Sequence, residues 1–144
     1  MPLYTCSSQR GLISLSNKAR ISRAITDVHC KVTAAPPDFV HVFFFDSDPA
    51  ELEQSTAAAG DRPPRFQLFG SIRAGRTDET KHALVSGMTE RVADILAVNA
   101  SEVGMSTRDV KAQWVMEGGD VLPEPGEEAA WLRRHSEKLA ESGS

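Results

Sequence analysis

Residues 14–33 (SLSNKARISRAITDVHCKVT) and 77–96 (TDETKHALVSGMTERVADIL) decide the fold, because they align without gaps at one offset. Lys18 matches Lys81, 63 positions later (81 minus 18), and the same offset pairs Thr26 with Thr89. Each stretch places apolar residues at helical spacing, namely Ile21, Ala24, Ile25, Val28 and Val32 in the first, and Leu84, Val85, Met88, Val92, Ile95 and Leu96 in the second. Two amphipathic helices are therefore predicted, and an internal duplication is the economical explanation of their likeness.

The ends of both helices carry start and stop signals. Ser14 or Ser16 is suited to cap the first helix, and the prolines after Thr33 end it. Thr77 is suited to cap the second, with Asp78 and Glu79 in its positively polarised first turn.

Each predicted helix is flanked by two stretches of strand character. They are LYTCSSQ (3–9) and DFVHVFFFD (38–46) around the first helix, and RFQLFGSIR (65–73) and EVGMSTRDV (102–110) around the second. The fold class is therefore mixed α/β (α+β), with a first β-α-β unit over 2–46 and a second over 64–110 in a single domain that spans 1–144. The run FVHVFFF is almost entirely apolar, which indicates a strand covered on both faces. Helices on one side leave the other face of so small a sheet bare, so we expect further subunits to cover it.

The remaining segments connect or extend these units. Residues 47–64 are polar and rich in turn formers, which indicates a surface connection. After Val110, the paired glycines at 118–119 predict a hairpin, and 111–144 ends in a short helix whose Trp131, Leu132 and Leu139 are expected to pack on the body or on a neighbour.

Composition excludes several classes of protein. The net charge is −4 and no Lys/Arg block occurs, so nucleic acid is not an expected partner. The most apolar stretch is too short to span a membrane and no secretory signal pattern is present, so a cytoplasmic location is expected. Cys6 and Cys30 lack metal-ligand spacing and are read as packing residues, and no metal or cofactor is expected.

Pro2 is the first candidate for chemistry. Removal of Met1, which a small second residue permits, would leave its nitrogen as a free secondary amine. An apolar setting near cations would lower the pKa of that amine below the ordinary α-amino range of about 7.7–8.0 and leave a base near neutrality. The alternative is an ordinary proline at the start of a strand.

Four further residues are candidates for the same site. Arg73 and Arg76 lie beside a predicted helix start, where guanidinium groups and free backbone N–H groups suit a carboxylate or phosphate, although arginines at a surface turn are often only solvated. His29 lies on the buried side of the first helix and is either a packed residue or a functional one. Glu117 precedes the glycine pair, where it could orient a water or simply lie at the rim.

Taken together, these residues resemble the tautomerase superfamily, and within it the group typified by cis-3-chloroacrylic acid dehalogenase. The resemblance covers nearly the whole chain: MPLYTCSSQ with Pro2, AITDVH ending at His29, IRAGRT with Arg73 and Arg76, and Glu117 followed by LPEPGEEAAW. One position departs from the pattern. Those dehalogenases carry a tyrosine in the last strand of the second unit, where this chain has Ser106, and serine is too short to replace a phenol.

The resemblance implies a homotrimer of fused β-α-β pairs with the amino-terminal proline in each active site. Pro2 would transfer protons, Arg73 and Arg76 would bind the substrate carboxylate, His29 would orient substrate or water, and Glu117 would activate water in dehalogenating members. A cofactor-independent tautomerase of a small 2-keto or enol acid is the expected function. The alternatives are a hydrolytic dehalogenase or hydratase of cis-3-haloacrylate-type acids, which Ser106 disfavours, and a non-catalytic trimeric binding protein.

Overall fold

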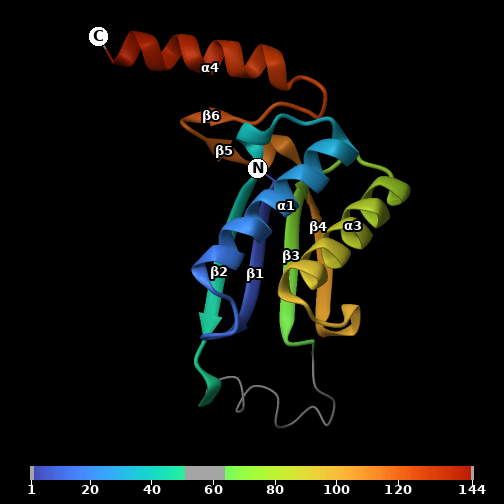
Figure 1. Ribbon diagram of the computed structural model, residues 1–144. Coiled ribbons are helices and arrows are strands. Elements are labelled where there is room, and N and C mark those ends of the chain that lie inside the picture. Colours follow the sequence, from blue (N-terminus) through green and yellow to red (C-terminus); the bar gives the residue numbers. More distant parts are fainter. Residues whose placement is uncertain (1, 51–63, 144) are drawn as a thin grey trace.

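The computed structural model describes residues 2–50 and 64–143 and is built on a four-stranded sheet (Figure 1). The strands are β1 (Leu3–Gln9), β2 (His41–Ser47), β3 (Phe66–Arg73) and β4 (Val103–Val110), in the order β2-β1-β3-β4. β1 pairs in parallel with β2, β3 pairs in parallel with β4, and the two central strands β1 and β3 run antiparallel. The two predicted β-α-β units are therefore confirmed, joined edge to edge through their first strands.

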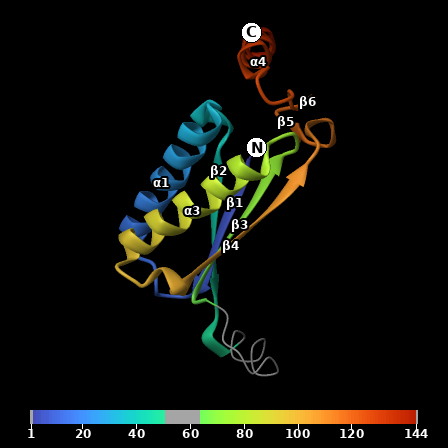
Figure 2. The same ribbon diagram turned by 90° about the vertical axis from the view of Figure 1, so that its right-hand side faces the viewer.

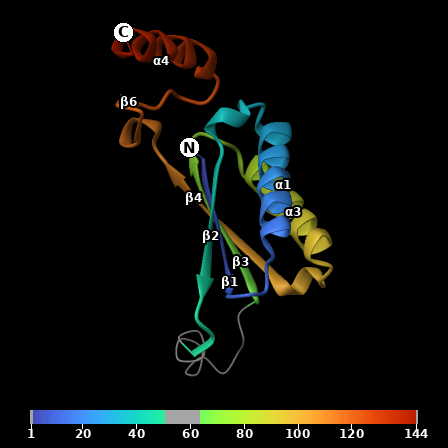
Figure 3. The ribbon, with the colours of Figure 1, turned by 60° about the vertical axis from the view of Figure 1, so that its left-hand side comes forward.

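Helices α1 (Leu15–Thr33) and α3 (Asp78–Leu96) cover one face of this sheet, as Figures 2 and 3 show from two sides. The predicted caps are present: Ser14 accepts a hydrogen bond from the Asn17 N–H, and Thr77 accepts one from the Thr80 N–H. The core lies between the helices and the sheet. Its fully buried members include Tyr4, Ile21, Ile25, Ile72, Leu84, Met88 and Val92.

The duplication extends to the polar contacts of the two units. Lys18 Nζ lies 2.8 Å from Asp46 Oδ2, and Lys81 Nζ, 63 positions on, lies 3.1 Å from Asp109 Oδ2. Both helices end at an alanine with positive φ, Ala34 at 60° and Ala97 at 55°. Equivalent positions in the two units therefore make equivalent contacts, which is expected if both units come from the duplication of one ancestral unit.

The second face of the sheet is bare within one chain. Phe43 and Phe45 of β2 are 54% and 56% exposed on that face, although a strand covered on both sides was predicted. Both helices lie on the other face, so among the described residues this face is bare, as the one-sided arrangement of helices predicted, and its cover by further subunits stays a prediction. Two exposed phenylalanines on one short strand make an apolar surface that subunits could cover.

The C-terminal segment crosses the end of the sheet near the N-terminus (Figure 1). A short two-stranded ladder, β5 (Met116–Glu117) and β6 (Asp120–Val121), forms the predicted hairpin, and α4 (Glu128–Ser142) follows. Trp131 is buried against Phe39, whereas Leu139 is 57% exposed and does not pack on the body of its own chain. Short 3-10 turns precede β2 (Pro37–Phe39), β4 (Ala100–Glu102) and β5 (Ala112–Trp114).

Most of the predicted 47–64 connection lies outside the described residues. No helix among residues 2–50 and 64–143 is both long and apolar enough to cross a membrane. Both cysteines are free thiols, with Cys6 buried in the core.

Candidate active site

Pro2 lies buried at the end of the sheet where two strands and two helices meet. Its carbonyl accepts a hydrogen bond from the backbone N–H of His41 at 3.0 Å, which fixes it beside the start of β2. The antiparallel register places Leu3 opposite Ser71, so the end of β3 lies next to the start of β1. Arg73, the last residue of β3, is therefore carried to the same end of the sheet as Pro2.

His29 is held by a tyrosine that the sequence analysis did not assign to the site. The Tyr4 hydroxyl and His29 Nδ1 are 2.7 Å apart, and both side chains are 1% exposed. Burial raises the pKa of the Tyr4 phenol. Burial, followed by the charges of Arg76 and Arg73, lowers the pKa of His29 to about 3. Both groups are therefore neutral at physiological pH.

These protonation states define what His29 can do. A neutral phenol that donates its proton to Nδ1 leaves the imidazole proton on Nε2. The buried Nε2 has no hydrogen-bond partner among the described residues. His29 therefore presents a neutral N–H donor, suited to orienting a bound oxygen and unsuited to supplying a charge.

The two arginines have different surroundings. Arg73 is 1% exposed, donates from Nη1 to the Pro123 carbonyl at 2.8 Å and from Nη2 to Glu128 Oε1 at 2.6 Å, and lies over the Phe39 ring. Arg76 is half-buried, and burial together with the Arg73 charge lowers the pKa of its guanidinium. The Nε groups of both arginines are buried without a partner in the described part of the chain. Arg73 is thus not the solvated arginine that a surface turn would provide.

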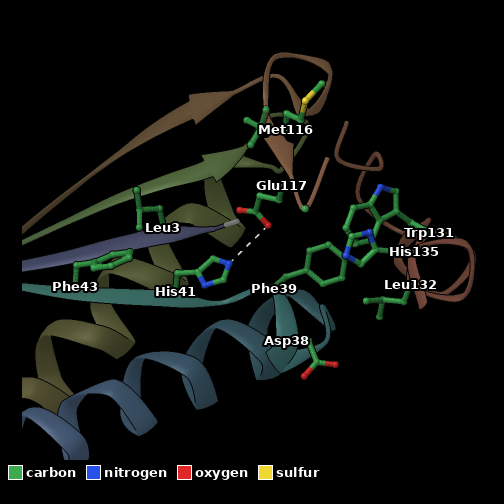
Figure 4. A pocket seen from close by; sticks show the side chains of 12 residues that line it. Leu3, Asp38, Phe39, His41, Phe43, Met116, Glu117, Trp131, Leu132 and His135 are labelled. Carbon is green, nitrogen blue, oxygen red and sulfur yellow. Dashed lines mark ion pairs between the residues drawn. The ribbon is translucent and has the colours of Figure 1, made fainter. Parts of the chain in front are cut away.

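Glu117 enters from the hairpin and pairs with a second residue that sequence reasoning missed. Its Oε2 lies 3.6 Å from Nε2 of His41, the first residue of β2 (Figure 4). The two side chains line a cavity of about 730 Å³ whose walls are mostly apolar. The remaining lining residues are Leu3, Asp38, Phe39, Phe43, Val115, Met116, Gly118, Trp131, Leu132 and His135.

Ser106 is not part of this group. It is exposed in the middle of β4 opposite Phe69, whereas the strand ends at Val110 beside Arg73. Four residues of strand separate them, about 13 Å at roughly 3.3 Å per residue. Pro2, His29, Arg73 and Arg76 thus lie at one end of the sheet, and Glu117 lines a cavity whose lining includes none of these four, while Ser106 lies apart from them within one chain.

Two unpredicted contacts complete the site, and neither has a strong sequence signal. In the sequence, Tyr4 is one of several inward-facing residues of an alternating strand. Glu128 is one of several carboxylates in a polar stretch. Their partners, His29 and Arg73, are 25 and 55 residues away. Within residues 2–50 and 64–143, no three acidic, histidine or cysteine side chains are grouped as metal ligands would be.

Comparisons with known proteins agree with this fold. Residues 1–136 match the family model Tautomerase_3, described as "Putative oxalocrotonate tautomerase enzyme". A search of curated proteins finds no match. Among solved structures, the chain is 31% identical to N1, a member of the cis-3-chloroacrylic acid dehalogenase family, over 97% of this chain and 99% of that one, with a TM-score of 0.84.

Two further structures extend the likeness. The native Ps01740 protein is 32% identical over 81% of this chain and 100% of its own, with a TM-score of 0.71. The FG41 malonate semialdehyde decarboxylase, inhibited by 3-bromopropiolate, is 21% identical over 90% of this chain and 96% of its own, with a TM-score of 0.67, and shares the fold. The chain belongs to the Tautomerase_3 family of the tautomerase superfamily and is similar to the cis-3-chloroacrylic acid dehalogenase group.

Proposed function

We propose that the protein is a cofactor-independent tautomerase that interconverts the enol and keto forms of a small 2-keto carboxylic acid. One observation carries this proposal: two arginines with unpartnered buried Nε groups, and a neutral histidine with an unpartnered Nε2, lie at the strand end that begins with Pro2. Buried donors without acceptors are costly in a folded protein unless something binds them. A carboxylate and an enolate oxygen are acceptors of the required kind.

Pro2 moves the proton in this mechanism. With Met1 removed, its neutral nitrogen accepts the proton of the enol hydroxyl, and the resulting ammonium returns a proton to carbon 3 as the carbonyl forms. The reaction is a balanced isomerisation that consumes no water. Burial and neighbouring positive charge both disfavour a charged amine, which favours the neutral form that this mechanism requires.

The cations bind and stabilise the substrate. Arg76, with Nε of Arg73, holds the carboxylate, and the same charges stabilise the enolate that develops as the proton moves. His29 donates from Nε2 to the enolate oxygen. No metal or organic cofactor takes part in this mechanism.

Hydrolytic dehalogenation or hydration of a cis-3-haloacrylate-type acid is the second candidate. The observation that favours it is Glu117, which lines the cavity beside His41 and could take a proton from water while protonated Pro2 delivers one to carbon 2. Addition of water across the double bond and loss of hydrogen halide would then give an aldehyde acid. Ser106 in place of the family tyrosine removes one support for that water, so this reaction ranks second.

A homotrimer is the assembly we propose, with the bare sheet face of each chain against its neighbours. The exposed Phe43 and Phe45 side chains support it, as do the related folds of fused 4-OT described as trimers. A trimeric binding protein without catalysis is the remaining alternative.

Ketonisation of enolised phenylpyruvate tests the proposed function, with intact mass to show loss of Met1. Pro2→Ala should lower kcat at least 100-fold, the ordinary contribution of a positioned proton-transfer group. A chain that keeps one residue before Pro2 is the matched control, since it retains the ring and loses only the basic amine, and it should be equally inactive. Full activity in either protein would refute catalysis by Pro2.

The same preparation separates the two reactions. Ketonisation without halide release from cis-3-chloroacrylate supports the tautomerase, and halide release as the faster reaction would reverse the ranking. Alkylation by 3-bromopropiolate should mark Pro2 alone, and an unmodified amino terminus would support the binding protein.

A further inference from the structure

Arg73 already donates two hydrogen bonds to other residues of its own chain. Bidentate recognition uses two parallel N–H groups of the guanidinium. In this protein Nη1 donates to the Pro123 carbonyl and Nη2 to Glu128, and only Nε lacks a partner among the described residues. The chain therefore uses two of the five N–H donors of Arg73, and the N–H on Nε is free for a ligand.

Glu128 is built into this arrangement through both of its oxygens. Oε1 accepts from Arg73 at 2.6 Å, and Oε2 accepts from the backbone N–H of Gly126 at 2.9 Å. Its side chain is 9% exposed, although it begins a helix at the surface end of the sheet. A carboxylate so enclosed is held in one orientation, and it fixes the guanidinium opposite.

The ion pair also changes the charge that a substrate meets. Arg73 and Arg76 act on each other and on His29, and Glu128 is the acidic side chain whose charge acts on both Arg76 and His29. Glu128 thus cancels one of the two guanidinium charges, while His29 is neutral. Among the described residues of the cluster, Arg76 is left as the side-chain cation without an ion-pair partner.

We propose that Glu128 is a positioning residue that makes this site selective for monocarboxylates over dicarboxylates. It holds Arg73 in a buried ion pair and cancels its charge, so a second carboxylate finds no second uncompensated cation. The inference rests on the proposed function in taking this cluster as the place where the substrate carboxylate binds. It adds the class of substrate, a monoanion.

Binding of two four-carbon acids tests the proposal without relying on turnover. Crotonate carries one carboxylate and fumarate two on the same extended skeleton, and calorimetry gives a Kd for each. Wild-type protein should bind crotonate more tightly. Glu128→Gln removes one negative charge and so leaves the charge of Arg73 uncompensated. The ratio of the two Kd values should therefore shift about tenfold toward fumarate, which is the effect of one unit charge about 10 Å away at an effective dielectric constant of about 20.

Three comparison variants complete the design. Glu127→Gln is the matched control, because it removes the adjacent exposed carboxylate, and its ratio should equal that of wild type. Arg73→Gln should shift the ratio toward crotonate. Arg73→Gln/Glu128→Gln removes both charges, so its ratio should return to the wild-type value even if Glu128→Gln alone does not fold.

The outcomes separate this inference from the proposed function. A ratio unchanged by Glu128→Gln would overturn the inference, and so would a double variant whose ratio stays shifted toward fumarate, because the effect of Glu128 would then not act through the charge of Arg73. Normal selectivity in a protein that does not ketonise enolised phenylpyruvate would refute the tautomerase alone. Ketonisation with equal affinity for both acids in wild type would refute the inference alone.

Discussion

Replacing Glu128 with glutamine should destabilise the protein far more than loss of an exposed ion pair. Arg73 and Glu128 are 1% and 9% exposed, with 2.6 Å between Nη2 and Oε1. Removal of one partner from a buried pair costs about 3–5 kcal/mol, because the other charge stays buried without compensation. Glutamine keeps one acceptor, so we expect about 3 kcal/mol, a large part of the roughly 5–15 kcal/mol that stabilises a domain.

Equilibrium unfolding in urea at one fixed protein concentration measures this loss. The control is Glu102→Gln, which breaks the Arg65–Glu102 pair, whose side chains are 53% and 36% exposed. That variant should lose at most about 1 kcal/mol. In thermal melts, the Tm of Glu128→Gln should fall by roughly 10 °C. A loss below about 1 kcal/mol for Glu128→Gln would show that the Arg73 charge is stabilised by something other than Glu128.

Acid titration adds a second check with a definite sign. Burial alone would raise the pKa of Glu128, but the hydrogen bonds from backbone N–H groups and from Arg73 hold it below its ordinary value. A carboxylate with a depressed pKa stabilises the fold above its unfolded pKa and loses that contribution as the pH falls through the folded one. The stability difference between wild type and Glu128→Gln should therefore shrink below about pH 4.

Three other predictions follow from single contacts. Tyr4→Phe should lower kcat with little change in fold, since it removes only the hydroxyl that orients His29 at 2.7 Å, and ketonisation kinetics will show it. Gly70→Ala should cost about 1–3 kcal/mol in urea unfolding, because its Cβ would lie 2.6 Å from Tyr4 Cε1. Phe45→Lys should lower the mass measured by light scattering from that of a trimer, and an unchanged mass would exclude this face as the interface.

The fold was predictable because its signals are local and repeated. Helical spacing, the caps at Ser14 and Thr77 and the 63-residue offset each depend on residues close in sequence or on direct comparison of two stretches. A bare face of the sheet was predicted from the helices on one side, but which side chains of β2 line that face was not. The sequence of an apolar strand is the same whether helices of its own chain or another chain cover it. The sequence therefore did not indicate that Phe43 is exposed in a single chain.

Candidate site residues could be named from the sequence, but their contacts could not. Arg73 and His29 were expected from their motifs, while the groups that set their behaviour, Glu128 and Tyr4, come from distant segments. Only the folded chain shows that His29 is buried and neutral and that Arg73 is already paired. The local sequence gives the type of each residue, whereas its burial and its hydrogen-bond or ion-pair partners decide whether its side chain is charged.

The duplication explains why one end of the sheet carries the candidate chemistry. The 63-residue offset is retained in the caps and in the Lys18 and Lys81 ion pairs, which are needed wherever the unit folds. It is not retained at the site, because Arg65 stands where Pro2 would recur and the buried Val92 where His29 would recur. Residues that hold the fold are therefore shared by the two units, while the candidate site residues are not repeated: Pro2 and His29 come from the first unit, and Arg73 and Arg76 from the second. The C-terminal segment, which supplies Glu117 and Glu128, is attached at that same end.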